Sequence, residues 1–141
     1  MADVSATGTD AASFFRRTME APLRILAVDN EPSITLSLRF VFDGPRYELT
    51  CVGSGGAALA RLDANSNLYD VIIVDQKMPG LTGLELVSAI RARGISGKII
   101  VVSAYLTHEI REAFERMGVE TMFSKPFIVE ELRSAVDRIA V

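Results

Sequence analysis

Residues 71–79 read VIIVDQKMP, in which four aliphatic residues in a row are followed at once by an acid. A short, continuous apolar run of this kind is typical of a strand that is buried on both faces of a parallel sheet. We therefore predict a strand over Val71–Val74, with Asp75 placed where that strand ends. Pro79 then marks a turn before the next element.

Three more apolar runs end near polar residues in the same way. They are Ile25–Val28 before Asp29-Asn30-Glu31, Ile99–Val102 before Ser103, and Thr121–Phe123 shortly before Lys125-Pro126. The carboxyl ends of parallel strands lie at one edge of a sheet, and ligands of open α/β sheets bind in the crevice at that edge. Acids, a hydroxyl and an ammonium group there suit a divalent metal ion with a phosphoryl group between them.

The rest of the chain alternates between strand and helix patterns. A further strand is predicted over Tyr47–Val52, and the run at residue 99 extends to a strand over Lys98–Val102. Helices are predicted over Ser33–Phe42, Gly55–Ala64, Thr82–Arg93 and His108–Met117, with a last helix marked by Ile128, Leu132, Val136 and Ile139. Five strands that alternate with five helices indicate an α/β fold with a doubly wound parallel sheet.

The segment Ser33–Phe42 fits two patterns. Its apolar residues alternate as they do in a strand, but several of them also share one face of a helix. Pro32 just before the segment and Gly44-Pro45 just after it are typical of the start and the end of a helix. We therefore predict a helix here.

The composition is that of one globular domain. The chain has 141 residues, of which 49% are hydrophobic and 23% are charged, and its net charge is −3. No long basic run is present, so nucleic acid binding is not expected. The single cysteine, Cys51, excludes an internal disulfide. With no secretory signal and no apolar run near the ~20 residues of a membrane span, we expect a cytoplasmic protein that does not bind membranes.

Residues 1–22 differ in composition from the rest of the chain. They begin with small and polar residues and continue with Asp10–Glu20, which contains Phe14, Phe15 and Met19. A flexible extension is the simpler interpretation, and a short helix with these apolar residues on one side is the alternative. We predict an extension over residues 1–22 and a folded domain over residues 23–141.

Four motifs give the chain a resemblance to the receiver domains of two-component response regulators. They are Val28-Asp29-Asn30-Glu31-Pro32, Asp75-Gln76-Lys77-Met78-Pro79 followed by Gly83-Leu84-Glu85-Leu86, Ser103-Ala104, and Lys125-Pro126-Phe127. The resemblance extends over Leu23–Val141 and implies a flavodoxin-like receiver fold with the strand order 2-1-3-4-5. Because no output domain follows the last helix, we expect a stand-alone response regulator similar to those of chemotaxis.

The resemblance also implies the chemistry. Asp75 matches the aspartate that accepts a phosphoryl group from a histidine kinase or a histidine phosphotransfer protein, and Lys125 and Ser103 match the residues that hold phosphoryl oxygens. The implied ligands of Mg2+ are Asp29, Asn30, Asp75 and the backbone carbonyl of Lys77, and the Lys125–Pro126 bond is expected to be cis. Such a protein is not a conventional enzyme, because it catalyses only its own phosphorylation and dephosphorylation. It signals through a protein target that the sequence does not identify.

One departure from the family pattern affects the metal. The family usually has a second acid after the first strand, whereas this chain has Asn30. An amide oxygen carries no formal charge, so we expect Mg2+ to bind about 10–100-fold more weakly than in a two-acid relative. Glu31 is a candidate to compensate, but we expect its side chain to turn towards the helix start. Magnesium titration of Asn30→Asp tests the expected deficit.

Other departures concern the switch and the lifetime of the phosphorylated state. Met122 replaces the aromatic residue that often lies three positions before the lysine, which predicts a conformational switch that is shallower or that uses Phe123 differently. Lys77 and Tyr105 lie two residues beyond Asp75 and Ser103, at positions that tune the lifetime in the family. Their bulk is expected to obstruct the attacking water and to slow the loss of phosphate.

Two other functions fit parts of the sequence. A degenerate receiver could act as an adaptor that does not depend on phosphorylation, which Asn30 and Met122 favour. A dinucleotide-binding enzyme is a remote alternative, because residues 53–58 read GSGGAA and fit the pattern G-x-G-x-x-A after a strand. That interpretation leaves Asp29, Ser103 and Lys125 unexplained.

Overall fold

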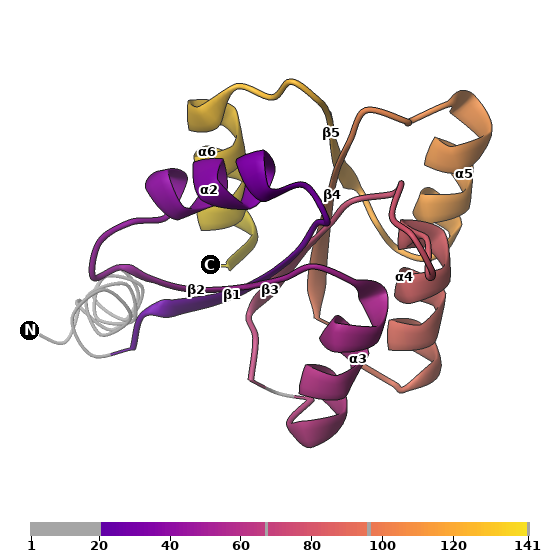
Figure 1. Ribbon diagram of the computed structural model, residues 1–141, viewed down its shortest axis with the longest axis horizontal. Helices are drawn as coiled ribbons and strands as arrows, with labels where there is room; N and C mark the ends of the chain where they lie inside the picture. The colour runs from indigo at the N-terminus through magenta and orange to yellow at the C-terminus, as the bar shows by residue number, and fades with distance from the viewer. Residues whose placement is uncertain (1–20, 67, 96, 141) are drawn as a thin grey trace, which may run out of the picture.

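The computed structural model describes residues 21–66, 68–95 and 97–140 of the chain. They form a sheet of five parallel strands in the order β2-β1-β3-β4-β5, with helices on both faces (Figure 1). The predicted α/β fold and its strand order are therefore confirmed. The predicted extension over residues 1–22 lies outside the described residues except for its last two positions, so its character stays a prediction.

The elements follow the predicted order. The strands are β1 (Leu23–Val28), β2 (Tyr47–Val52), β3 (Val71–Val74), β4 (Lys98–Ser103) and β5 (Thr121–Ser124). The helices are α2 (Pro32–Val41), α3 (Gly55–Ala64), α4 (Gly83–Ala92), α5 (His108–Arg116) and α6 (Val129–Ala140). β2, α3 and β3 have the predicted bounds, and the other predicted ranges differ by one or two residues at an end. None of the described helices has the length and hydrophobicity needed to cross a membrane.

Each face of the sheet has its own hydrophobic core. Helices α2 and α6 lie on one face, and α3, α4 and α5 lie on the other (Figure 1). In β3, Ile72 and Val74 pack with α3, α4 and α5, whereas Val71 and Ile73 pack with α2 and α6. Because both faces of the strand are covered, every position needs an apolar side chain, which explains the unbroken run in the sequence.

The ambiguous segment forms a helix, as predicted. Leu38 and Val41 of α2 are buried in the core that α2 shares with α6. Leu36 and Phe40 lie on the outer side and are 57% and 76% exposed. The alternating pattern therefore arises because this helix carries two large apolar residues on its outer side, not because the segment is a strand.

Tyr47 links the edge strand β2 to helix α6. Its hydroxyl donates a hydrogen bond to Asp137 Oδ1 at 2.9 Å, and Arg46 Nη2 lies 3.5 Å from Asp137 Oδ2. Burial, together with the bonded carboxylate, raises the pKa of Tyr47 above its usual value of 10.0. The folded protein therefore keeps the phenol proton to a higher pH than the unfolded chain does, so its stability falls as the pH rises through that range.

Tyr47→Phe is expected to lower the free energy of unfolding by about 1 kcal/mol at neutral pH, because one hydrogen bond to a carboxylate is lost. It is also expected to flatten the decline in stability above pH 10. Urea denaturation in both pH ranges measures the two effects. Tyr105→Phe, which removes an exposed phenol, is the control. An unchanged alkaline profile in Tyr47→Phe would contradict this assignment.

Candidate functional site

Hydrogen bonds of the sheet set where the polar side chains emerge. Asp29 and Asp75 each extend the ladder by one residue, donating their N–H groups to the carbonyls of Val52 and Val28 at 3.1 and 3.0 Å. After β5, the backbone N–H of Lys125 donates to the carbonyl of Ser103, the last residue of β4, at 3.0 Å. The polar residues therefore emerge at one edge, where the strands end.

The Lys125 ammonium lies at the centre of the site. Its Nζ is 2.8 Å from Asp29 Oδ2, 2.7 Å from Glu31 Oε1 and 3.5 Å from Asp75 Oδ2. The side chains of Lys125, Asp29 and Asp75 are only 9%, 5% and 4% exposed. The Lys125–Pro126 peptide bond is cis, as the resemblance implied. Residues as far apart in the chain as Asp29 and Lys125 thus form one contact group.

The electrostatics of this group favour a further cation. Burial raises the pKa of Asp29, and the charge of Asp75 adds to this, while hydrogen bonds from Lys125 and from the Glu31 N–H act in the opposite direction. Burial alone would lower the pKa of Lys125, but its hydrogen bonds to Asp29 and Glu31 outweigh that effect and raise it. One ammonium among three carboxylates leaves a formal charge of 1 − 3 = −2. A cation of higher charge would therefore stabilise the group.

Glu31 does not lie where the sequence predicted. The expectation that its side chain turns towards the helix start is wrong, because Glu31 is the N-cap residue of α2 and its side chain forms no capping hydrogen bond. The Glu31 N–H donates to Asp29 Oδ1 at 2.9 Å, which closes a local turn, and the Glu31 carboxylate contacts Lys125 instead. Carboxylate oxygens of Asp29, Glu31 and Asp75 lie within 4.8 Å of one another. The two-residue spacing from Asp29 is the sequence signal that could have indicated this.

The turn after Asp75 is held by Gln76, which the sequence analysis did not single out. Gln76 is buried, its Oε1 accepts the N–H of Leu84 at 2.9 Å, and its carbonyl accepts the N–H of Gly83 at 2.8 Å. A Cβ added at Gly83 would lie 2.6 Å from the carbonyl oxygen of Asp75. The start of α4 therefore packs directly against the backbone of Asp75. A polar residue next to a buried strand end, with a glycine at the following helix start, could have indicated this.

Ser103 is the last residue of β4, and the two predicted tuning residues, Lys77 and Tyr105, lie on the loops after β3 and β4. Ser103 is completely buried, and its Oγ accepts the N–H of Tyr105 at 3.2 Å. Lys77 Nζ lies 4.3 Å from the centroid of the Tyr105 ring, within the range of a cation–π interaction. This contact connects the loop after β3 to the loop after β4. The sequence predicted both residues at this edge but not the contact between them.

The two remaining predicted residues differ in their surroundings. Asn30 is exposed beside Asp29, and its contact with a metal stays a prediction. Met122 is half-buried in β5 and packs against the core under α3, α4 and α5. Met122 therefore interacts with this core through packing, since a thioether offers only weak hydrogen bonding.

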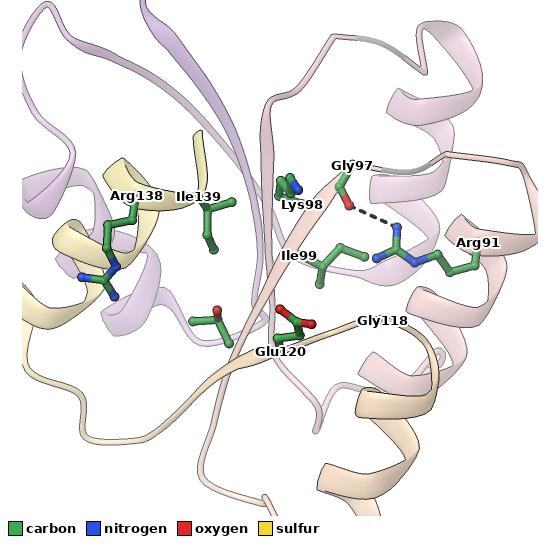
Figure 2. Close-up of a pocket in the computed structure, with 9 residues that line it drawn as sticks. Arg91, Gly97, Lys98, Ile99, Gly118, Glu120, Arg138 and Ile139 are labelled. Atoms are coloured by element: carbon green, nitrogen blue, oxygen red, sulfur yellow. Dashed lines mark hydrogen bonds between the residues drawn. The ribbon is translucent and has the colours of Figure 1, made fainter. Parts of the chain in front are cut away.

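A cavity also lies at the opposite edge of the sheet, where β4 and β5 begin. It has a volume of about 410 Å³, and Arg91, Lys98, Glu120 and Arg138 are among the residues that line it. Figure 2 shows the Arg91 guanidinium pointing to the Gly97 carbonyl. The same guanidinium also donates to the carbonyls of Ile95 and Met117, all at 3.0–3.1 Å. Arg91 therefore has a structural role, since it joins the end of α4 to the end of α5.

Fold and site together define a receiver-type signalling domain. The buried acid that follows the central strand β3, and the lysine beside a cis proline after β5, belong to the motifs on which the resemblance to receiver domains rests. The chain belongs to the response regulator receiver domain family, whose model matches residues 25–137. This family comprises signalling domains rather than conventional enzymes.

Individual relatives agree with this assignment. The chain is 28% identical over 115 residues to sporulation initiation phosphotransferase F of Bacillus subtilis, covering 82% of this chain and 91% of the relative. It is 35% identical over 111 residues to the response regulator MprA of Mycobacterium sp., covering 79% of this chain and 47% of that protein. A solved structure of the chemotaxis protein CheY4 of Vibrio cholerae is 29% identical with a TM-score of 0.76, covering 84% of this chain and 99% of that chain. The chain thus spans nearly all of sporulation initiation phosphotransferase F but about half the length of MprA.

Family membership replaces the dinucleotide-binding interpretation of residues 53–58. The side chain of Ser54 accepts the N–H of Ala57 and caps α3. A Cβ added at Gly55 would lie 2.8 Å from Leu81 Cβ. Gly55 is therefore explained by the close packing of the start of α3 against the loop before α4, without a pyrophosphate.

Proposed function

We propose that this protein accepts a phosphoryl group on Asp75 from a histidine kinase or a histidine phosphotransfer protein, with Mg2+ bound, and then signals through contacts with a protein target. The observation that carries the proposal is the contact group of Asp29, Glu31 and Asp75 around the buried Lys125 ammonium. A carboxylate attacks phosphorus effectively only where cations offset the negative charges that meet.

The chain's own residues account for the transfer step. A carboxylate oxygen of Asp75 attacks the phosphorus, and the P–N bond to the donor imidazole breaks with its electron pair moving to that nitrogen, which takes a proton from solvent. Lys125 is placed to neutralise a phosphoryl oxygen, because its Nζ is 3.5 Å from Asp75. Ser103 Oγ accepts a hydrogen bond from the Tyr105 N–H, so its own hydroxyl hydrogen remains free to donate to another phosphoryl oxygen.

The donor set at the site suits magnesium. Mg2+ prefers oxygen ligands, and three carboxylates offer oxygens within 4.8 Å of one another. Asp29, Asp75, Asn30 and the backbone carbonyl of Lys77 are the ligands we propose. When bound, the ion neutralises charge between the Asp75 carboxylate and the incoming phosphoryl oxygens.

Incubation with a small acyl phosphate and Mg2+, followed by intact-protein mass spectrometry, tests the proposal. We expect the mass of one added phosphoryl group, and no addition when a chelator removes the metal. An adaptor that does not depend on phosphorylation, which Asn30 and Met122 favoured, would show no added mass with or without the metal. That result would reject the proposed function and leave the adaptor.

The output is expected to involve α5, β5 and α6. Ser124 at the end of β5 accepts a hydrogen bond from Arg111 Nη2 on α5 at 3.2 Å, which joins these elements just before Lys125. Met122 in the same strand packs against the core below α5. A movement of Lys125 towards a phosphoryl group is therefore expected to displace Ser124 and, through it, Arg111 on α5. We propose that a protein partner binds there, and that the switch is shallower than in relatives with an aromatic residue at the position of Met122.

The contact between Lys77 and Tyr105 predicts a slow loss of phosphate. Two bulky side chains that touch each other, two residues beyond Asp75 and Ser103, are expected to restrict the approach of the attacking water. An exposed cation–π contact contributes about 0.5–1 kcal/mol, so Lys77→Ala is expected to speed dephosphorylation by at least about two- to fivefold. A time course of phosphate release after donor removal measures this, with Lys98→Ala at the opposite edge as the control. Turnover of the unmodified protein within seconds would contradict it.

A further inference from the structure

We propose that Glu31 takes over the metal-binding role of the acid that is missing at Asn30. The inference rests on the proposed function, because it assumes that Mg2+ binds beside Asp75. In the motif Asp29-Asn30-Glu31, the second negatively charged ligand would then lie one residue later in the chain than the family pattern has it.

The positions of the carboxylates support this role. Oxygens of Asp29, Glu31 and Asp75 lie within 4.8 Å of one another. Two oxygens bound to the same Mg2+ ion lie at most about 4.2 Å apart, because each is about 2.1 Å from the metal. The three acids are thus already close to the spacing that a shared ion requires, and a small adjustment is enough.

Glu31 is the side chain with the freedom to make that adjustment. Asp29 and Asp75 are almost fully buried, whereas the Glu31 side chain is 54% exposed. Its backbone is fixed by the hydrogen bond from its N–H to Asp29 Oδ1 at 2.9 Å. The carboxylate can therefore move over a short distance between Lys125 and a nearby ion while the main chain stays in place.

The role of Lys125 gives a second argument. In the structure its Nζ is 2.7 Å from Glu31 Oε1, the shortest of its three contacts with acids. Lys125 also has to hold a phosphoryl oxygen in the proposed reaction, so an acid held this closely competes with the phosphoryl group. A Glu31 carboxylate that binds the ion instead leaves the ammonium available. A counter-ion role for Glu31 alone provides no such release.

A double-mutant cycle on Glu31 and Asn30 tests the proposal in the unphosphorylated protein. The chain has no tryptophan, so isothermal titration calorimetry with MgCl2 at constant ionic strength is the suitable measurement. We expect Glu31→Gln to weaken Mg2+ binding by about tenfold or more. If Glu31 supplies the charge, the deficit of about 10–100-fold expected from Asn30 in the sequence no longer applies. Asn30→Asp alone should then tighten Mg2+ binding by less than about threefold, and adding Asn30→Asp to Glu31→Gln should restore most of the lost affinity.

The control is Glu120→Gln, which removes the same charge at the opposite edge of the sheet. If Glu31→Gln changes the affinity no more than this control does, Glu31 is only a counter-ion of Lys125 and the inference is wrong. A gain in Mg2+ affinity of about 10–100-fold from Asn30→Asp alone would also overturn the inference. Such a gain would mean that Glu31 does not supply the negative charge that Asn30 lacks. These results differ from failure of the proposed function, in which the unmodified protein neither binds Mg2+ nor gains a phosphoryl group.

Discussion

Asp75→Asn is expected to abolish phosphorylation completely. The substitution keeps the size and shape of the side chain but replaces the nucleophilic carboxylate by an amide, which does not attack phosphorus. The Asp75 side chain is 4% exposed and lies 3.5 Å from Lys125 Nζ. Of the three acids in this contact group, Asp75 is the one that directly follows the central strand β3. Intact-protein mass spectrometry after incubation with an acyl phosphate and Mg2+ measures the loss.

The fold is expected to survive this change. Removing one of three carboxylates around a single ammonium lowers the repulsion among them, so the melting temperature of Asp75→Asn without metal should be equal to or higher than that of the unmodified protein. Asp43→Asn, which neutralises an exposed acid in the turn after α2, is the matched control and should be phosphorylated normally. Continued phosphorylation of a folded Asp75→Asn protein would move the acceptor to another residue.

Gly83→Ala is expected to lower the free energy of unfolding by about 1–3 kcal/mol, which is the usual cost of forcing extra volume into a packed site. The new Cβ would lie 2.6 Å from the Asp75 carbonyl oxygen and 2.8 Å from Gln76 Cα. Both are backbone atoms, so the strain cannot be relieved by a side-chain rotation. Helix α4 or the turn after Asp75 has to shift. We therefore also expect slower phosphorylation. Chemical denaturation and the rate of mass gain measure the two effects.

Gly56→Ala is the matched control for this prediction. Gly56 lies in the first turn of α3, and a Cβ there meets no atom within 4 Å. Alanine restricts the unfolded chain and favours the helix, so this variant is expected to gain about 0.4–1 kcal/mol. If both glycine variants behave alike, the close packing of α4 on Asp75 is not what makes Gly83 necessary.

The sequence was sufficient for the fold because the buried strands have an unmistakable pattern. Val71–Val74 is covered by helices on both faces, so its apolar run is unbroken and its end is sharp. The same reasoning placed Asp29, Asp75 and Ser103 at one edge before their contacts were known. The exposed apolar residues of α2 made that segment ambiguous, and the flanking prolines and glycine resolved it.

The sequence was not sufficient for contacts made by loop residues. The direction of Glu31 depends on the local turn that its N–H forms with Asp29, and the expectation about its side chain was wrong. The contact of Lys77 with Tyr105 joins two loops whose relative position no local propensity determines. Gln76 was overlooked because its importance lies in hydrogen bonds to the next helix. Such details depend on tertiary packing, which periodicity does not encode.

The guanidinium of Arg91 has a consequence for how a signal could travel through the domain. Its hydrogen bonds to three backbone carbonyls join the C-terminal end of α4 to the loop before β4 and to the end of α5. The N-terminal end of α4 is joined to the turn after Asp75 by the two hydrogen bonds that Gln76 accepts from Gly83 and Leu84. A displacement of that turn is therefore expected to tilt α4 about Arg91, so that the helix moves furthest close to Asp75.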